Sequence, residues 1–203
     1  MQVNDLFKTL DQPADEAVFK EKGSKFLAYA YPLSRQEEVD DLLQSLKKTH
    51  PKARHWCYAW QLGVEHPTFR YNDDGEPNNS AGKPIFGQIQ SFDLTNVLVV
   101  VVRYFGGTKL GVGGLVTAYR SAAKMTLENA VIVERMLMEK VALQFEYAHM
   151  DKVMRIIKEN DLDIVSQTME LDCLLQILVR KNKLDSVLEL FENLRCIKIK
   201  QIK

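Results

Sequence analysis

The sequence has 203 residues, 46% hydrophobic and 27% charged, which is typical of a globular protein with a sizeable core. Its 27 Lys and Arg balance its 27 Asp and Glu, so a generally basic nucleic-acid-binding surface is excluded and any phosphate contact must come from local charge. No apolar run reaches the ~20 residues of a membrane helix, the N-terminal segment does not read as a signal peptide, and the three cysteines form no CxxC pair. We therefore expect a cytoplasmic protein without a disulfide framework or a zinc ribbon.

The first part of the chain predicts alternating strands and helices. KFLAYAYPL, residues 25–33, alternates large and small apolar residues as a strand does. Ser34 stands three residues before Glu37, the spacing of a capping box, so we expect a helix that ends before Pro51. In chain order, we also expect a strand at 55–62, a short strand opening the polar loop 68–84, a helix at 85–92, a strand at 96–105 and a long helix at 115–130. The four consecutive valines of the strand at 96–105 indicate that it is buried on both faces.

The second part has a different pattern and no glycine, since all ten glycines lie at or before Gly114. We place the boundary near residues 133–137, giving domains 1–135 and 136–203. The order of the predicted elements is β-α-β-β-α-β, the ferredoxin-like or split-βαβ pattern. The expected elements are strands at 138–147, 162–169, 170–180 and 196–202, and helices around 153–157 and 184–194.

A glycine-rich segment, residues 103–124, carries four cations and no acidic residue. Glycine supplies turns with positive φ and close helix packing, which is a purely structural reading. It also leaves backbone N–H groups uncovered at a helix N-terminus, where anions bind. Val112 and Val116 stand where a P-loop and a dinucleotide fingerprint need Lys and Gly, so neither motif is present. We predict a phosphate or nucleic-acid site formed by Arg103, Gly106, Gly107, Lys109, Gly111, Gly113, Gly114, Arg120 and Lys124.

An acidic loop, DDGEPNNSAGKP, occupies residues 73–84. Its carboxylates are of the kind that bind divalent metals or act as acid and base, but the EF-hand spacing is absent and we expect no metal site. An Asp-Gly turn, with Ser80 capping the next helix, accounts for the pattern structurally. The S-x-x-K spacing of Ser80 and Lys83 recurs twice elsewhere in the chain and is uninformative. We favour a loop that recognises a partner through Asp73, Asp74, Glu76, Ser80 and Lys83.

His55 and Cys57 are two residues apart on a predicted strand and therefore share a face. A Cys–His dyad or a metal pair is conceivable, but no third ligand stands at a suitable spacing. We favour a buried cysteine and a hydrogen-bonded histidine.

Three segments together, RYFGGTKLGVGGLVTAYRSAA, DDGEPNNSAGKPI and GSKFLAYAYP, resemble the YigZ/IMPACT family of translation-linked proteins. Residues 18–132 are similar to its N-terminal domain, and the rest is similar to the ferredoxin-like C-terminal domain of bacterial members. The resemblance implies a two-domain α+β protein, whose first domain has the α/β fold with a left-handed βαβ crossover shared by a small-subunit ribosomal protein, elongation factor G and the GHMP kinases. Asn79 stands where family members usually have Gly, and Asn tolerates a positive φ better than most residues.

The resemblance also implies a role. Eukaryotic relatives regulate translation by competing for an activator of an initiation-factor kinase, and RNA or ribosome binding is the usual proposal for bacterial members. We predict a non-catalytic, cytoplasmic regulator of translation that binds RNA or the ribosome through the glycine loop, with no cofactor. Two alternatives stay open: an enzyme that binds a nucleotide or phosphate in the same cleft with help from the acidic loop, and a pure protein-interaction module with a protein or translation-factor partner.

Overall fold

The computed structural model describes residues 5–202 and contains two compact units. The first unit is Phe7–Arg135. The second begins at Met136 and also includes Asp5 and Leu6 from the start of the chain. Within residues 5–202, no helix combines the length and the apolar character that a membrane crossing requires.

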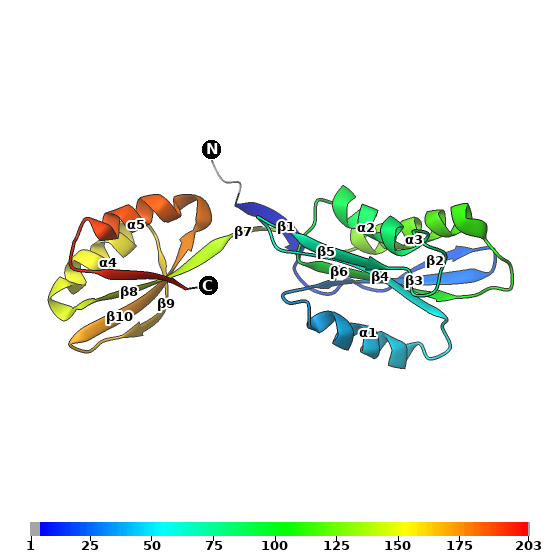
Figure 1. Ribbon diagram of the computed structural model, residues 1–203, viewed down its shortest axis with the longest axis horizontal. Coiled ribbons are helices and arrows are strands. Elements are labelled where there is room, and N and C mark those ends of the chain that lie inside the picture. The colour runs from blue at the N-terminus through cyan, green and yellow to red at the C-terminus, as the bar shows by residue number, and fades with distance from the viewer. Residues whose placement is uncertain (1–4, 203) are drawn as a thin grey trace. The chain divides into compact units, whose positions relative to one another are not determined.

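A five-stranded sheet forms the centre of the first unit (Figure 1). Every neighbouring pair in it is antiparallel, so β3 and β4, which flank β6, run in the same direction and are connected by a crossover through α1. The left-handed sense of this crossover stays a prediction. In sheet order the strands are β2 (Ala17–Glu21), β3 (Ser24–Pro32), β6 (Val97–Tyr104), β4 (His55–Leu62) and β5 (Thr68–Asn72).

Helices cover both faces of this sheet. Figure 1 shows α1 (Glu38–Thr49) on one face, and α2 (Gly82–Ser91) and α3 (Gly111–Glu128) on the other. Side chains of β6 alternate between the two cores, since Val99 and Val101 pack beneath α2 and α3 whereas Val100 and Val102 face α1. The predicted strand buried on both faces is therefore confirmed, because strand side chains point alternately to opposite sides.

Some local expectations were wrong. The backbone N–H of Ser34 donates to Glu38, 3.1 Å away, rather than to Glu37, and α1 begins at Glu38, four residues after the predicted cap at Ser34. Three strands were not predicted from the sequence: β2, and the pair β1 (Leu6–Leu10) and β7 (Ile132–Met136), which form a separate two-stranded sheet.

The second unit contains a four-stranded antiparallel sheet with α4 (Met150–Glu159) and α5 (Leu184–Glu192) on one face (Figure 1). The element order is the predicted β-α-β-β-α-β, with one-turn 3₁₀ helices at Tyr147–His149 and Lys181–Lys183 before the two α-helices. Its core consists of strand side chains packed against these helices. In sheet order the strands are β11 (Lys198–Ile202), β8 (Met138–Glu146), β10 (Asp172–Arg180) and β9 (Asp163–Thr168).

Asp5 is anchored to the second unit by a bidentate ion pair. Its two carboxylate oxygens lie 2.7 and 2.9 Å from Nε and Nη2 of Arg180. The backbone N–H of Asn182 donates to the same carboxylate, and the N–H of Leu137 donates to the Asp5 carbonyl. The hydrogen bonds from Arg180 lower the pKa of Asp5, because they stabilise the ionised carboxylate.

Candidate functional site

Three loops meet at one end of the five-stranded sheet. Phe26 at the start of β3 and His55 at the start of β4 are both paired with Arg103 near the end of β6. The tight turn before β3, the glycine loop after β6 and the acidic loop after β5 therefore lie at the same end. The enzyme alternative considered from the sequence already placed the glycine loop and the acidic loop in one cleft, but the main prediction treated them separately.

The glycines of the loop have two different environments. A Cβ on Gly106 would lie 1.9 Å from the carbonyl carbon of Gly23, so this glycine allows two backbone segments to touch. Gly107 and Gly111 have φ of 88° and 70°, which favours glycine. A Cβ on Gly111 or on Gly113 would meet nothing within 4 Å, so the backbone there is uncovered on that side.

The last three glycines of the predicted loop, Gly111, Gly113 and Gly114, belong to the first turn of α3, which starts four residues earlier than predicted. The N-cap residue of this helix, Leu110, makes no side-chain cap hydrogen bond, and the first turn has no acidic residue. The first N–H groups of a helix have no partner within the helix and carry a partial positive charge. This end of α3 therefore favours an anion.

The predicted cations do not gather at one point. Arg103 is 5% exposed, and its Nη1 lies 2.6 Å from Oε1 of Glu76, so it is not free to contact a phosphate as we expected. Lys109 in the loop and Arg120 on α3 are exposed. Lys124 is paired with Glu128 at 3.4 Å, and it lies about 20 Å along the helix from Gly111 at a rise of about 1.5 Å per residue.

Carboxylates of the acidic loop point into the fold. Asp73 accepts hydrogen bonds from the N–H groups of Asn79, Ala81 and Gly82 at 2.8–2.9 Å. It therefore satisfies the start of α2, the role we predicted for Ser80. The capping by Ser80 in the structural alternative is wrong, because its buried hydroxyl donates to the Pro77 carbonyl instead.

The remaining predicted residues of this loop are divided between the interior and the surface. Asp74 accepts the N–H of Trp56 at 2.7 Å, and Glu76 is buried, whereas Lys83 is exposed. Asn79 has φ of 61°, the left-handed conformation that we expected it to tolerate. The predicted role of this loop in binding a partner stays a prediction, and the geometry shows that most of its polar groups hold the loop itself.

Glu76 is the centre of a buried polar network. Besides Arg103, it accepts a hydrogen bond from the Tyr119 hydroxyl at 2.8 Å, and Nε2 of His55 lies 3.9 Å away. Burial raises the pKa of the Tyr119 hydroxyl, and the nearby Cys57 thiol and Glu76 raise it further. The network therefore connects the acidic loop, β6 and α3 beneath the surface.

The reading of His55 and Cys57 as a hydrogen-bonded histidine and a buried cysteine is confirmed. Nδ1 of His55 is 2.8 Å from the Asp74 carbonyl, and the Cys57 thiol contacts the Asp73 carbonyl and the Tyr119 hydroxyl. Burial raises the pKa of Cys57, so the thiol stays protonated at neutral pH and is a poor nucleophile. Among the described residues, no group of three or more His, Cys, Asp or Glu side chains is arranged to hold a metal ion.

A cavity of about 270 Å³ lies between the acidic loop and the start of α3. Neither Arg120 nor Lys124 lines it. Phe105, an exposed aromatic residue in its wall, was not among the predicted site residues. The signal for it was an aromatic residue just after β6 and directly before two glycines. The lining residues are Glu76, Pro77, Arg103, Phe105, Lys109, Leu110, Gly111, Val112 and Leu115.

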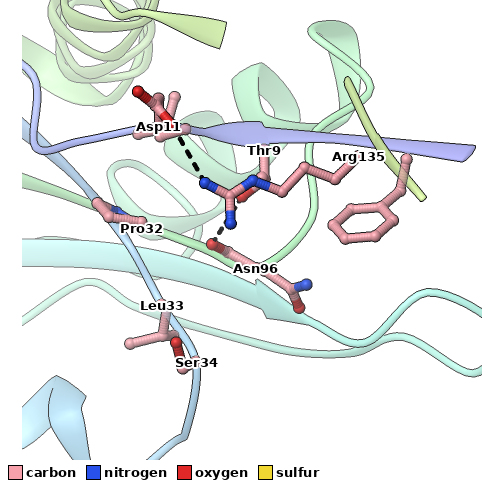
Figure 2. Close-up of a pocket in the computed structure, with 9 residues that line it drawn as sticks. Thr9, Asp11, Pro32, Leu33, Ser34, Asn96 and Arg135 are labelled. Carbon is pink, nitrogen blue, oxygen red and sulfur yellow. Dashed lines mark hydrogen bonds and ion pairs between the residues drawn. The ribbon is translucent and has the colours of Figure 1, made fainter. Parts of the chain in front are cut away.

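Two other cavities lie in the same unit. One of about 260 Å³, on the other side of Leu110, is lined by Gly113, Gly114 and Lys22 among others. A larger one of about 340 Å³ lies where β1 passes the end of β3 (Figure 2). Figure 2 shows Arg135 directed at Asp11, and these two side chains form an ion pair at 3.1 Å. None of the predicted site residues lines the larger cavity.

Residues 22–127 match the Impact N-terminal domain family. The chain belongs to the IMPACT family. The IMPACT family member YvyE of Bacillus subtilis (strain 168) is 33% identical over 152 residues, which are 75% of this chain and 70% of that protein. The Protein IMPACT homolog of Saccharomyces cerevisiae is 33% identical over 94 residues, 45% of this chain and 36% of that protein. A crystal structure described as a hypothetical protein covers 99% of both chains at 26% identity and a TM-score of 0.73. The predicted IMPACT membership and two-domain α+β fold class are thus confirmed.

Proposed function

We propose that this protein is a non-catalytic, cytoplasmic regulator of translation that binds RNA, free or in the ribosome, through phosphates at the first turn of α3. The observation that carries the proposal is the uncapped, acid-free start of α3 with exposed Lys109 beside it. Family membership supports the link to translation, because the resemblance implies regulatory eukaryotic relatives.

Three features of this helix start favour a phosphate: the helix dipole, positively charged side chains and an accessible backbone. Free N–H groups at a helix start bind phosphate oxygens, and the helix dipole adds a partial positive charge. Gly111 and Gly113 present no Cβ, so a phosphate can approach the backbone closely. Lys109 and Arg120 add full charges on the loop and on the exposed side of the helix. Such contacts are independent of base sequence.

No observation favours the alternative of a nucleotide-dependent enzyme. Asp73 already accepts three backbone hydrogen bonds, and Glu76 is paired with Arg103. Both oxygens of Asp73 are thus occupied by backbone N–H groups, and Oε1 of Glu76 is occupied by Arg103 and the Tyr119 hydroxyl.

The test is RNA binding by fluorescence anisotropy across a salt series. Lys109→Ala with Arg120→Ala should weaken binding to single-stranded RNA and reduce the slope of log affinity against log salt by about 1.4, because two phosphate contacts are lost. A matched control, Lys48→Ala with Lys152→Ala, removes two exposed charges from α1 and α4. Equal affinity and slope for the first variant and the wild type would show that the start of α3 is not the phosphate site.

A further inference from the structure

The cavity of about 270 Å³ has an apolar wall that the phosphate contacts do not use. Phe105 follows β6 directly and is 42% exposed, and Val112 in the first turn of α3 is 56% exposed. A volume just below the range of pockets for drug-sized ligands suits one small ring system. The wall is completed by Pro77, Leu110 and Leu115.

Two guanidinium groups lie near the ring of Phe105. The Cζ atoms of Arg54 and Arg103 are 5.8 and 5.7 Å from the ring centroid. Arg54 is exposed, and no carboxylate within residues 5–202 pairs with it. An aromatic ring with cations beside it is a stacking platform of the kind that proteins use to bind nucleobases.

The rim of the same cavity carries the phosphate-binding groups. Lys109 and Gly111, the first residue of α3, line it together with Phe105. Glu76 also lines it, but its charge is balanced by Arg103 at 2.6 Å. A ligand with a flat ring and an adjacent phosphate therefore meets both parts of the wall.

We infer that this cavity takes one unpaired base of a single-stranded RNA, with the ring against Phe105 and the adjoining phosphate at Lys109 and the start of α3. The inference rests on the proposed function and adds a preference for single strands. In a duplex both faces of each base are covered by neighbouring bases, so Phe105 cannot stack on one.

The experiment compares RNA ligands with the full-length protein. Fluorescence anisotropy is measured on a single strand of about 12 nucleotides, on an abasic strand of the same length, and on a duplex. Phe105→Ala should weaken binding of the single strand by about 5- to 150-fold, and Phe105→Trp should restore it. Both Phe105→Ala and the wild type should bind the abasic strand equally. The matched control is Phe69→Ala, an aromatic residue that is 55% exposed on β5 and does not line the cavity.

The outcomes separate this inference from the proposed function. If Phe105→Ala binds the single strand as the wild type does while Lys109→Ala with Arg120→Ala weakens it, the base site is refuted and the phosphate site stands. If the wild type binds no RNA, both are refuted. Adenosine monophosphate is titrated as a further ligand. Binding of this nucleotide as tight as that of the strand, with the same loss in Phe105→Ala, would show that the occupant is a free nucleotide and overturn the inference.

Discussion

Removal of the Glu76 carboxylate tests whether the buried network stabilises the first unit. In Glu76→Ala, the guanidinium of Arg103 is left buried without its carboxylate partner, since its side chain is only 6% exposed and its other side-chain hydrogen bond is to the Ser24 hydroxyl at 3.4 Å. Breaking a buried ion pair by removing one partner costs about 3–5 kcal/mol. Tyr119 also loses its acceptor. We expect the free energy of unfolding to fall by about 4 kcal/mol, a large part of the total for a domain.

The assay is urea unfolding at neutral pH, monitored by tryptophan fluorescence. Both tryptophans, Trp56 and Trp60, lie on β4, so the signal reports the first unit. At this size, a loss of about 4 kcal/mol corresponds to a fall in Tm of roughly 10–20 °C. The control is Glu128→Ala, which breaks the exposed pair with Lys124 and should cost less than about 0.5 kcal/mol.

A double change separates the unpaired charge from the lost packing. Glu76→Leu with Arg103→Met replaces the pair by apolar side chains and should cost less than Glu76→Ala alone, because no charge is left buried. If Glu76→Ala costs less than about 1 kcal/mol, or the double variant is the less stable of the two, the reasoning about this network is wrong.

Three further predictions concern other contacts. Gly106→Ala should lower the free energy of unfolding by more than about 3 kcal/mol in the same urea assay, since its Cβ would overlap the Gly23 backbone. Gly113→Ala has open space around the new Cβ and should be neutral or stabilising by up to about 1 kcal/mol. Iodoacetamide added to the native protein at mildly alkaline pH should label Cys196, which is partly exposed. It should not label Cys57, because burial raises the pKa of this thiol. Mass spectrometry of the labelled protein checks this. Because Arg180 lowers the pKa of Asp5, this pair stabilises the fold at pH values above the unfolded pKa of the carboxyl group, and the contribution is lost as pH falls through the folded pKa. The difference in stability between the wild type and Asp5→Asn should therefore be larger at neutral than at acid pH. Unfolding followed by circular dichroism at both pH values checks this.

Regular elements could be predicted wherever burial leaves a periodic pattern. Consecutive valines identified β6, and apolar residues at helical spacing identified α1, α3 and α5. The strands β1 and β7 were missed because each has five residues with interspersed polar ones, and their pairing joins segments more than a hundred residues apart. No local sequence signal encodes such a pairing.

The candidate site was only partly predictable. Glycine and charge content indicated an open helix start near Gly111, which the structure contains. The direction of Arg103 was misjudged, although it shares its parity along β6 with Val99 and Val101, the valines beneath α2 and α3. That alternation indicates an inward side chain. The partner that permits its burial, Glu76, belongs to a distant loop, and only the three-dimensional arrangement reveals it.

The ion pair between Asp5 and Arg180 joins residues separated by 175 positions. At about 5–20 residues per second, a nascent chain carries an unmatched Asp5 for roughly 10 s or more before its guanidinium is made. Phe7–Arg135 can meanwhile complete its own contacts, so Asp5 is fixed among the last. Loss of the Asp5 carboxylate should consequently weaken the portion synthesised at the end rather than the five-stranded sheet of Phe7–Arg135.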